Sequence, residues 1–176
     1  FEKGANVTSG TPTLQIPSFS LTAGLTGLGA SILNPVDVDI NVSGGVTRPG
    51  AAAGTLKLDG TSTGNIISGV MQDNGGNKLT VIKQNTSTWT LAGPNTHTGT
   101  TTVNGGTLHL TGSLAAGSAV TVGGATATGT PTLTGAGGTV NGTLLVAAAG
   151  GGAAGTVNPG TVGTVGTLNV ANNTTI

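Results

Sequence analysis

The stretch Thr88–Leu110 reads TWTLAGPNTHTGTTTVNGGTLHL, and it decides the fold. It predicts three short strands, at 88–91, 100–103 and 107–110. Strand side chains alternate between two faces, so Trp89 and Leu91 share one face. Residues 100–103 are all β-branched and suit a pleated surface. Gly93-Pro94-Asn95 and Asn104-Gly105-Gly106 supply the turns. No catalytic pattern lies here, and the stretch predicts a β-coil that stacks on another coil.

The last part of this stretch recurs downstream. The phrase at 102–110 (TVNGGTLHL) returns at 139–146 (TVNGTLLV) and at 164–170 (TVGTLNV), with a weaker copy near Val120. Val103 and Val140 are 37 residues apart, and Val140 and Val165 are 25 apart. Imperfect periods of this size indicate a solenoid, and 37 fits one coil plus an excursion or two short coils. We therefore expect one inward stack of Val103, Val140 and Val165, and a second of Leu108, Leu144 and Leu168.

Three segments, 69–76, 79–83 and 88–108, closely resemble the autotransporter-associated β-strand repeat. The family phrase is approximately KxGxGTWTLSGxNTYTGxTTVNxGTL. His97 stands where that phrase has Tyr, Pro94 occupies a variable position, and residues 84–87 replace a glycine-containing turn. The resemblance covers about residues 56–122 well and the later tail loosely. It implies a secreted or cell-surface protein, because the repeat occurs in large secreted proteins, and it specifies fold better than function.

The predicted fold is all-β, a right-handed parallel β-helix or solenoid over residues 55–176, with about seven coils. Residues 1–54 are expected to form an N-terminal arm or cap that contains β-strands. Residues 37–42 alternate cleanly, with Val38, Ile40 and Val42 inward. Further strands are expected at 56–58, 66–70 and 79–82. The alternative fold is a β-sandwich completed by strand exchange.

Composition limits the possible partners. The 176 residues include 34 Gly, 5 basic and 5 acidic residues and no Cys, and nothing after Lys83 is charged. Nucleic acid is not an expected partner, because phosphate binding needs clustered Lys or Arg. No disulfide or thiolate metal site can form, and no apolar run is long enough to span a bilayer as a helix. Near-zero net charge gives little repulsion between copies and favours self-association.

The candidate site residues fit structural roles better than catalytic or metal-binding ones. His97 and His109 lack nearby carboxylates, so outward ladder positions are favoured over a metal or catalytic pair. Asp37 and Asp39 point outward from an alternating strand, which does not suit a paired-carboxylate cleft. Residues 73–77 (DNGGN) offer oxygen ligands but lack a known calcium-loop spacing, so a turn is favoured. We expect no cofactor, no metal and no catalytic residue.

Two further assignments concern packing and assembly. Trp89 could be a carbohydrate platform, but its position beside Leu91 favours the core. The predicted core and ladder residues are Trp89, Leu91, Val103, Leu108, Val140, Leu144, Val165 and Leu168. The predicted assembly arm carries apolar side chains in one alternating register, with Pro17 favouring an edge: Leu14, Ile16, Phe19 and Leu21.

The favoured function is a structural subunit of an extracellular or cell-surface assembly. The subunits would polymerise into a filament by β-strand complementation, with the segment 172–176 completed by a neighbour as part of another coil. One alternative is a passenger segment of a surface adhesin that binds glycans or other cells. Another is a non-catalytic fragment of a secreted glycan-active enzyme, which the small number of acidic residues disfavours. The expected partners are therefore further copies of the chain and, in the adhesin alternative, glycans.

Overall fold

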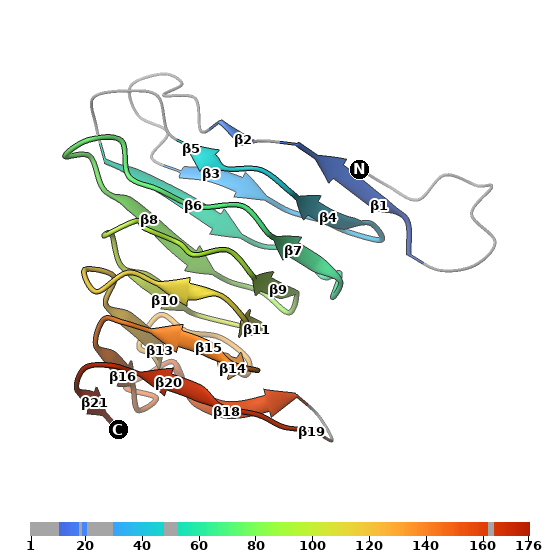
Figure 1. Cartoon of the computed structure of the whole chain (residues 1–176). Helices are drawn as coiled ribbons and strands as arrows, with labels where there is room; N and C mark the ends of the chain where they lie inside the picture. Colours follow the sequence, from blue (N-terminus) through green and yellow to red (C-terminus); the bar gives the residue numbers. More distant parts are fainter. Residues whose placement is uncertain (1–10, 18, 21–29, 48–52, 162–163) are drawn as a thin grey trace.

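A computed structural model describes residues 11–17, 19–20, 30–47, 53–161 and 164–176. These residues form β-strands, turns and bends without any helix (Figure 1). The strands pair almost entirely in parallel and form sheets that run along the length of the molecule. The prediction of an all-β parallel solenoid is therefore confirmed.

Two long sheets form two faces of the molecule. The first sheet contains, in spatial order, β1 (Thr13–Ile16), β4 (Asp39–Val42), β7 (Asn65–Ile67), β9 (Thr88–Leu91), β11 (Thr107–Leu110), β14 (Thr132–Gly135), β18 (Thr156–Thr161) and β19 (Thr164–Val165). The second sheet contains β3 (Ala30–Leu33), β6 (Gly54–Leu58), β8 (Leu79–Lys83), β10 (Thr101–Val103), β13 (Val120–Gly124), β16 (Leu144–Val146) and β21 (Thr174–Thr175). The short β17 (Ala153–Ala154) pairs antiparallel with β13.

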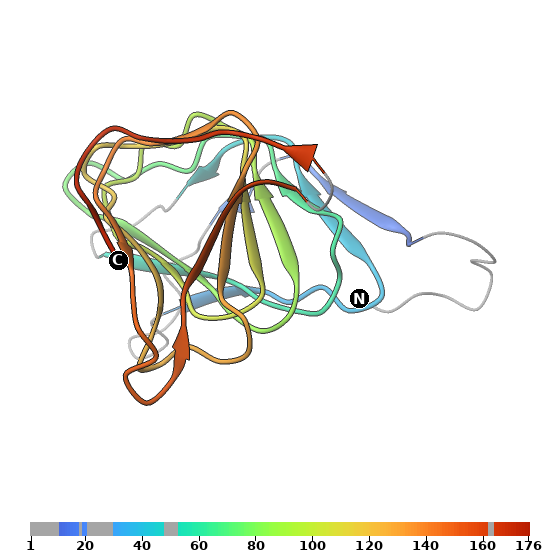
Figure 2. The same cartoon turned by 90° about the horizontal axis from the view of Figure 1, so that it is seen from below.

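A third, narrower face joins these two sheets. It contains β12 (Ser113–Leu114), β15 (Gly138–Val140) and β20 (Leu168–Val170), and, towards the N-terminus, the pair β2 (Phe19–Ser20) and β5 (Val46–Thr47). Isolated bridges from Val46 to Met71 and from Pro94 to Ser113 lie between these two groups. Each turn of the chain visits the first sheet, the third face and the second sheet, as β11, β12 and β13 do. The described residues thus build seven stacked coils, whose strands overlie one another in the view along the stack (Figure 2).

Apolar side chains stack in register inside the coils. Ile16, Val42, Ile67, Leu91 and Leu110 pair in that order across the first sheet, at intervals of 26, 25, 24 and 19 residues. The last four of these side chains are fully buried, as period-two alternation requires of inward positions. Each such side chain contributes about 1.5–3 kcal/mol relative to an exposed one. The coils therefore share one continuous apolar core.

Glycine sets the distance between coils at the corner that leaves the first sheet. A Cβ atom added to Gly93 would lie 2.2 Å from the carbonyl oxygen of Gly69, and one added to Gly112 would lie 2.2 Å from that of Gly93. No side chain fits at such a distance. Glycine at the same place in successive coils is what allows the backbones to stack there.

The predicted valine stack is wrong. Val103 pairs with Lys83 and Val122 in the second sheet. Val140 lies on the third face and pairs with Val170. Val165 is in β19, which pairs antiparallel with β18, and its side chain is 98% exposed. The recurring phrase therefore marks three different corners of the coil and does not mark one position in successive coils.

The predicted leucine stack is wrong for the same reason. Leu108 lies in the first sheet, where it pairs with Trp89, and Leu144 lies in the second sheet. Leu168 lies on the third face, where it pairs with Gly138. Leu108 and Leu144 are buried and Leu168 packs at the edge of the core. Each leucine restarts a strand after a corner, but each one restarts it on a different face.

The N-terminal region continues the solenoid over its described residues. β3 pairs with β6 and β4 pairs with β7, so both long sheets cross the expected boundary at residue 54. Of the predicted arm residues, Leu14 and Ile16 belong to β1, which pairs with β4 of the same chain. Phe19 belongs to β2, which pairs with β5, and Leu21 lies outside the described residues. The described part of the arm therefore forms the outermost coil of its own solenoid.

Candidate functional site

Trp89 lies in the interior of the solenoid. The side chain is fully buried, and its Nε1 donates a hydrogen bond of 3.0 Å to the carbonyl oxygen of Asp59, one coil away. Ser87 Oγ donates to the same carbonyl at 2.7 Å. The indole is thus held by packing and by a polar anchor, and its ring is not available as a carbohydrate platform.

Two buried side chains of opposite charge, Asp59 and Lys83, lie near this anchor. The Asp59 carboxylate accepts hydrogen bonds from Gly60 N at 2.7 Å and from Gln84 Nε2 at 2.6 Å, and a further one from Asn85 Nδ2. The Lys83 side chain is fully buried, and its Nζ donates to the carbonyl oxygens of Gln84, Asn85 and Gly105 at 2.7, 3.2 and 3.0 Å. These bonds connect three successive coils at one corner.

The two charges affect each other's ionisation. Burial acts to raise the pKa of Asp59, but its three hydrogen bonds and the positive charge of Lys83 hold that pKa below its usual value. Burial lowers the pKa of Lys83 to about 8, although the Asp59 carboxylate opposes this effect. At neutral pH Lys83 is still mostly charged, so the corner contains a buried ammonium that depends on its surrounding oxygen atoms.

Asparagine side chains make a second polar column, on the third face. Asn95 Oδ1 accepts from Met71 N at 3.1 Å, and its Nδ2 donates to the carbonyl oxygens of Gly93 and Ser113. Asn141 Nδ2 donates to the carbonyl oxygen of Leu114 at 2.9 Å. Each amide bridges the backbones of adjacent coils where regular strand pairing is interrupted. These asparagines hold adjacent coils together, which is a structural role.

His97 is buried, which contradicts the outward position expected from the sequence. Its Nε2 lies 3.1 Å from Thr101 Oγ1 and 3.4 Å from Ser118 Oγ, and the two hydroxyls lie 3.1 Å apart. Burial lowers the pKa of His97, against the opposing effect of the Asp73 charge. A histidine and a serine in contact could suggest nucleophilic catalysis, but both side chains are fully buried. The trio instead forms a hydrogen-bonded group inside the coil through His97 Nε2 and the two hydroxyls, while His97 Nδ1 has no partner among the described residues.

The lowered pKa of His97 predicts acid sensitivity. A protein with a depressed histidine pKa in the folded state binds fewer protons than its unfolded chain as the pH falls below about 6.5. We therefore expect the free energy of unfolding to fall between pH 6.5 and 5, by no more than about 2 kcal/mol for His97. Urea denaturation at a series of pH values measures this slope.

Two matched variants test whether the His97 ring causes this pH dependence of the free energy of unfolding. His97→Gln should flatten it, whereas His109→Gln should remove a smaller part, because burial lowers the pKa of His109 as well. An unchanged slope in His97→Gln would show that the buried ring does not govern the response.

Asp73 braces a turn between two coils. Its Oδ1 accepts from Leu79 N at 2.8 Å, and its Oδ2 accepts from the backbone N and the Oγ1 of Thr98 at 3.0 and 2.7 Å. Both carboxylate oxygens of Asp73 therefore accept hydrogen bonds from the protein at the positions where they would bind a calcium ion. Across the part of the chain that the structure describes, no group of three His, Cys, Asp or Glu residues is placed to hold a metal ion. The favoured assignment of residues 73–77 as a turn agrees with these contacts.

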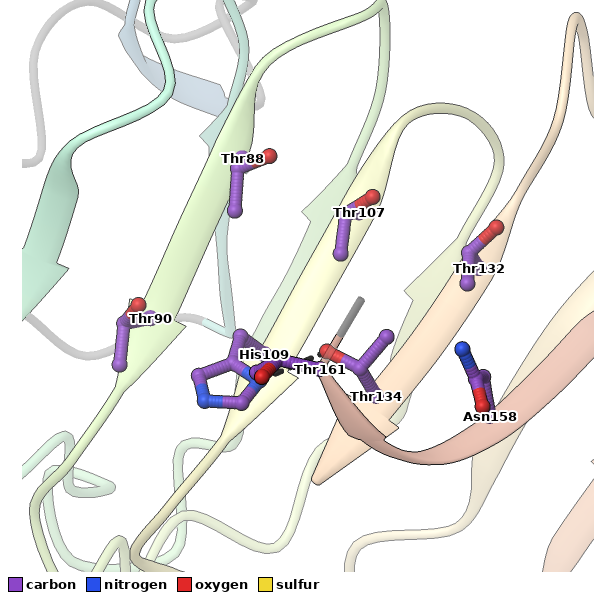
Figure 3. A pocket seen from close by; sticks show the side chains of 8 residues that line it. All are labelled: Thr88, Thr90, Thr107, His109, Thr132, Thr134, Asn158 and Thr161. Carbon is purple, nitrogen blue, oxygen red and sulfur yellow. Dashed lines mark hydrogen bonds between the residues drawn. The ribbon is translucent and has the colours of Figure 1, made fainter. Parts of the chain in front are cut away.

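The outer surface carries two adjoining hollows. The larger, of about 350 Å³, lies over the outer face of the first sheet (Figure 3). Its lining comes from outward positions of neighbouring strands and consists of Thr88, Thr90, Thr107, His109, Thr132, Thr134, Asn158 and Thr161. The smaller, of about 290 Å³, lies at the corner with the second sheet and includes Asn85, Thr86, Thr107, Thr128 and Thr130. Thr107 belongs to both hollows.

The strand register produces the ordered lining of the larger hollow. Thr88, Thr107 and Thr132 pair across β9, β11 and β14 and form one row. Thr90, His109, Thr134 and Asn158 pair in the next row, which extends to β18. His109 Nδ1 and Thr134 Oγ1 lie 2.7 Å apart. The outward side of alternating strands thus presents a polar grid that is independent of the apolar core.

The remaining candidate residues have ordinary positions. Asp37 is exposed with φ of 56°, and Asp39 Oδ1 accepts from Gly64 N at 2.9 Å. Trp89, Leu91, Val103, Leu108, Val140 and Leu144 are buried, Leu168 is half-buried and Val165 is exposed. Asp59 and Lys83 were not predicted from the sequence as buried polar residues. The available signal was Lys83 itself, which follows Leu79 and Val81 at an inward position of the alternation.

Comparison with known protein families identifies a match in the middle of the chain. Residues 81–110 match the family model of the passenger-associated-transport-repeat. The match confirms the resemblance to the autotransporter-associated repeat and includes residues 88–110. No curated protein matches the chain, and no solved structure matches it.

The passenger-associated-transport-repeat has a clear structural counterpart. Its residues include most of β8 and all of β9, β10 and β11, so it covers more than one coil. It contains Lys83, Trp89, Gly93 and His97, which are the interior polar and packing residues described above. The matched segment therefore supplies interior and corner residues of the solenoid. Among the described residues, no helix is long and apolar enough to cross a membrane.

Proposed function

We propose that the chain is a non-catalytic structural segment of a secreted or cell-surface protein, and that copies assemble head to tail into a filament. The surface location rests on the passenger-associated-transport-repeat at residues 81–110. The assembly rests on the geometry of the stack. The coil is built by parallel strand addition, and the same operation can continue from one copy to the next.

The observation that supports assembly is the pair of open sheet edges. Among the described strands, β1 and β3 are outermost at one end of the long sheets; at the other end β19 and β21 are outermost in the long sheets, and β20 is outermost on the third face. An outermost strand presents unpaired backbone N–H and C=O groups that a further strand can satisfy. The two ends differ, so their contact would be heterologous and would propagate unless it closed a ring. Zero formal net charge offers little repulsion between copies.

Electron microscopy and sedimentation of the purified chain test this proposal. The unmodified chain is expected to form fibres whose amount rises with protein concentration. Asn169→Lys combined with Thr175→Lys places two charges on the edge strands β20 and β21 and should leave monomers, because lysine on an edge strand opposes further pairing. The matched control, Thr102→Lys with Thr121→Lys, places the same charges within the second sheet and should still form fibres.

Two results would contradict the proposed contact between copies. If the unmodified chain stays monomeric at all concentrations, the filament proposal fails. If the edge variant forms fibres as readily as the control, the contact between copies does not use β20 and β21.

A further inference from the structure

We propose that the two hollows that meet at Thr107 form one binding site for a neutral oligosaccharide. One sugar unit would lie beside His109 in the larger hollow. The oligosaccharide would continue over Thr107 towards Thr128 in the smaller one. This inference does not depend on filament formation, because the site lies on the side of the solenoid and not at its ends.

The lining matches the chemistry of sugars. The structure records no side-chain hydrogen bond for the hydroxyls of Thr88, Thr90 and Thr107, and each can both donate and accept. Asn158 adds two donors and one acceptor at the far side of the hollow. The threonine methyl groups supply apolar area between these polar atoms, as the C–H faces of a sugar ring require. A ligand rich in hydroxyl groups would find partners along both rows of the grid.

Charge limits the ligand further. Every side chain that lines either hollow is uncharged, apart from the titratable ring of His109. Burial lowers the pKa of that ring, so it is mostly neutral at pH 7. Two charged groups lie at this corner: Lys83 directs its Nζ to backbone carbonyl oxygens inside the coil, and the Asp59 carboxylate accepts from the side chains of Gln84 and Asn85. The site therefore offers no cation to an anionic ligand, and neutral sugars fit it better than uronates or phosphates.

Shape indicates a short chain of sugars. The hollows of about 350 and 290 Å³ share Thr107, so they adjoin at the corner between β11 and the second sheet. The larger one is near the lower end of the usual range for small-molecule pockets. In Figure 3, Asn158 of β18 lies at one side of the hollow, and Thr161, at the end of the same strand, is drawn beside His109 and Thr134. One sugar unit fills the larger hollow, and a second reaches the smaller one.

Histidine NMR signals provide a direct test, because the chain has only two histidines. The probes are cellotetraose, maltotetraose and the tetramer of N-acetylglucosamine, with tetragalacturonate as an anionic probe of equal length. At least one neutral probe should shift the His109 ring signals and the Asn158 amide signals in a saturable way. The expected dissociation constant is on the order of 1 mM, at the weak end of affinities, because the lining of the two hollows contains no Phe, Tyr or Trp ring for stacking. The buried His97 should serve as an unshifted reference.

Isosteric variants locate the site. Thr90→Val with Thr107→Val removes two hydroxyls from the grid and should weaken binding at least tenfold. Thr102→Val with Thr121→Val makes the same change on the outer face of the second sheet and should leave affinity unchanged. The proposal is overturned if no neutral probe gives a saturable shift, if tetragalacturonate binds as tightly, or if both double variants lose affinity equally.

Discussion

Replacing Trp89 by alanine is expected to lower the free energy of unfolding by about 3–5 kcal/mol. The ring is fully buried between the positions of Asn65 and Leu108 in the adjacent coils, so its removal leaves a cavity that a stacked backbone cannot easily close. The change also deletes the donor to the Asp59 carbonyl oxygen. Chemical denaturation should be followed by far-ultraviolet circular dichroism, because Trp89 is the chain's single tryptophan and the variant has no indole fluorescence.

Two further variants separate packing from hydrogen bonding. Trp89→Phe keeps most of the apolar volume but loses the donor, and should cost roughly 1–3 kcal/mol. Thr90→Ala, at the adjacent outward position, should change stability by less than about 0.5 kcal/mol. A loss below 1 kcal/mol for Trp89→Ala would mean that the neighbouring coils collapse into the space, and that the indole does not hold them together.

Local alternation made the strands predictable from the sequence. The expected segments 79–82, 88–91 and 107–110 correspond to β8, β9 and β11, with Trp89, Leu91, Leu108 and Leu110 buried as period two requires. The order in which the strands stack was not predictable from the recurring phrase. Each of these corners combines a β-branched residue, a glycine-containing turn and a strand restart, whichever faces it joins, and the valine is buried at Val103 and Val140 but exposed at Val165. The phrase therefore recurs at three corners, and its spacing does not report the length of a coil.

The interior polar residues were harder to predict, for a different reason. His97 lies in an irregular segment after Pro94, where no alternation tells inward from outward, so its burial has no sequence signal. Lys83 does follow an alternating strand, but a lysine at its inward end is usually taken as the place where the strand reaches solvent. Its burial depends on backbone carbonyl oxygens from another coil, including that of Gly105, and only the stacked structure brings them together.

Asp59→Ala is expected to destabilise the fold by about 1–3 kcal/mol at pH 7, the range for leaving buried hydrogen-bond donors without their acceptor. Gly60 N and the side-chain amides of Gln84 and Asn85 lose their acceptor, and the Lys83 ammonium loses the negative charge that offsets its burial. Asp59→Asn keeps the shape and part of the hydrogen bonding, so it isolates the effect of charge. Urea unfolding curves of the full chain measure both variants.

Lys83→Met completes the test, because it removes the cation that Asp59 supports. In the double variant Asp59→Ala/Lys83→Met, the loss should be smaller than the sum of the two single losses by roughly 1–3 kcal/mol, as expected for residues in one network.

Burial lowers the pKa of Lys83 to about 8, so at pH 10 the amine is neutral in the folded chain. The penalty of Asp59→Asn should therefore shrink from pH 7 to pH 10, a window that no tyrosine or cysteine complicates, because the chain has neither. Additive losses together with a penalty independent of pH would show that Asp59 supports the corner through its hydrogen bonds alone, without coupling to the Lys83 charge.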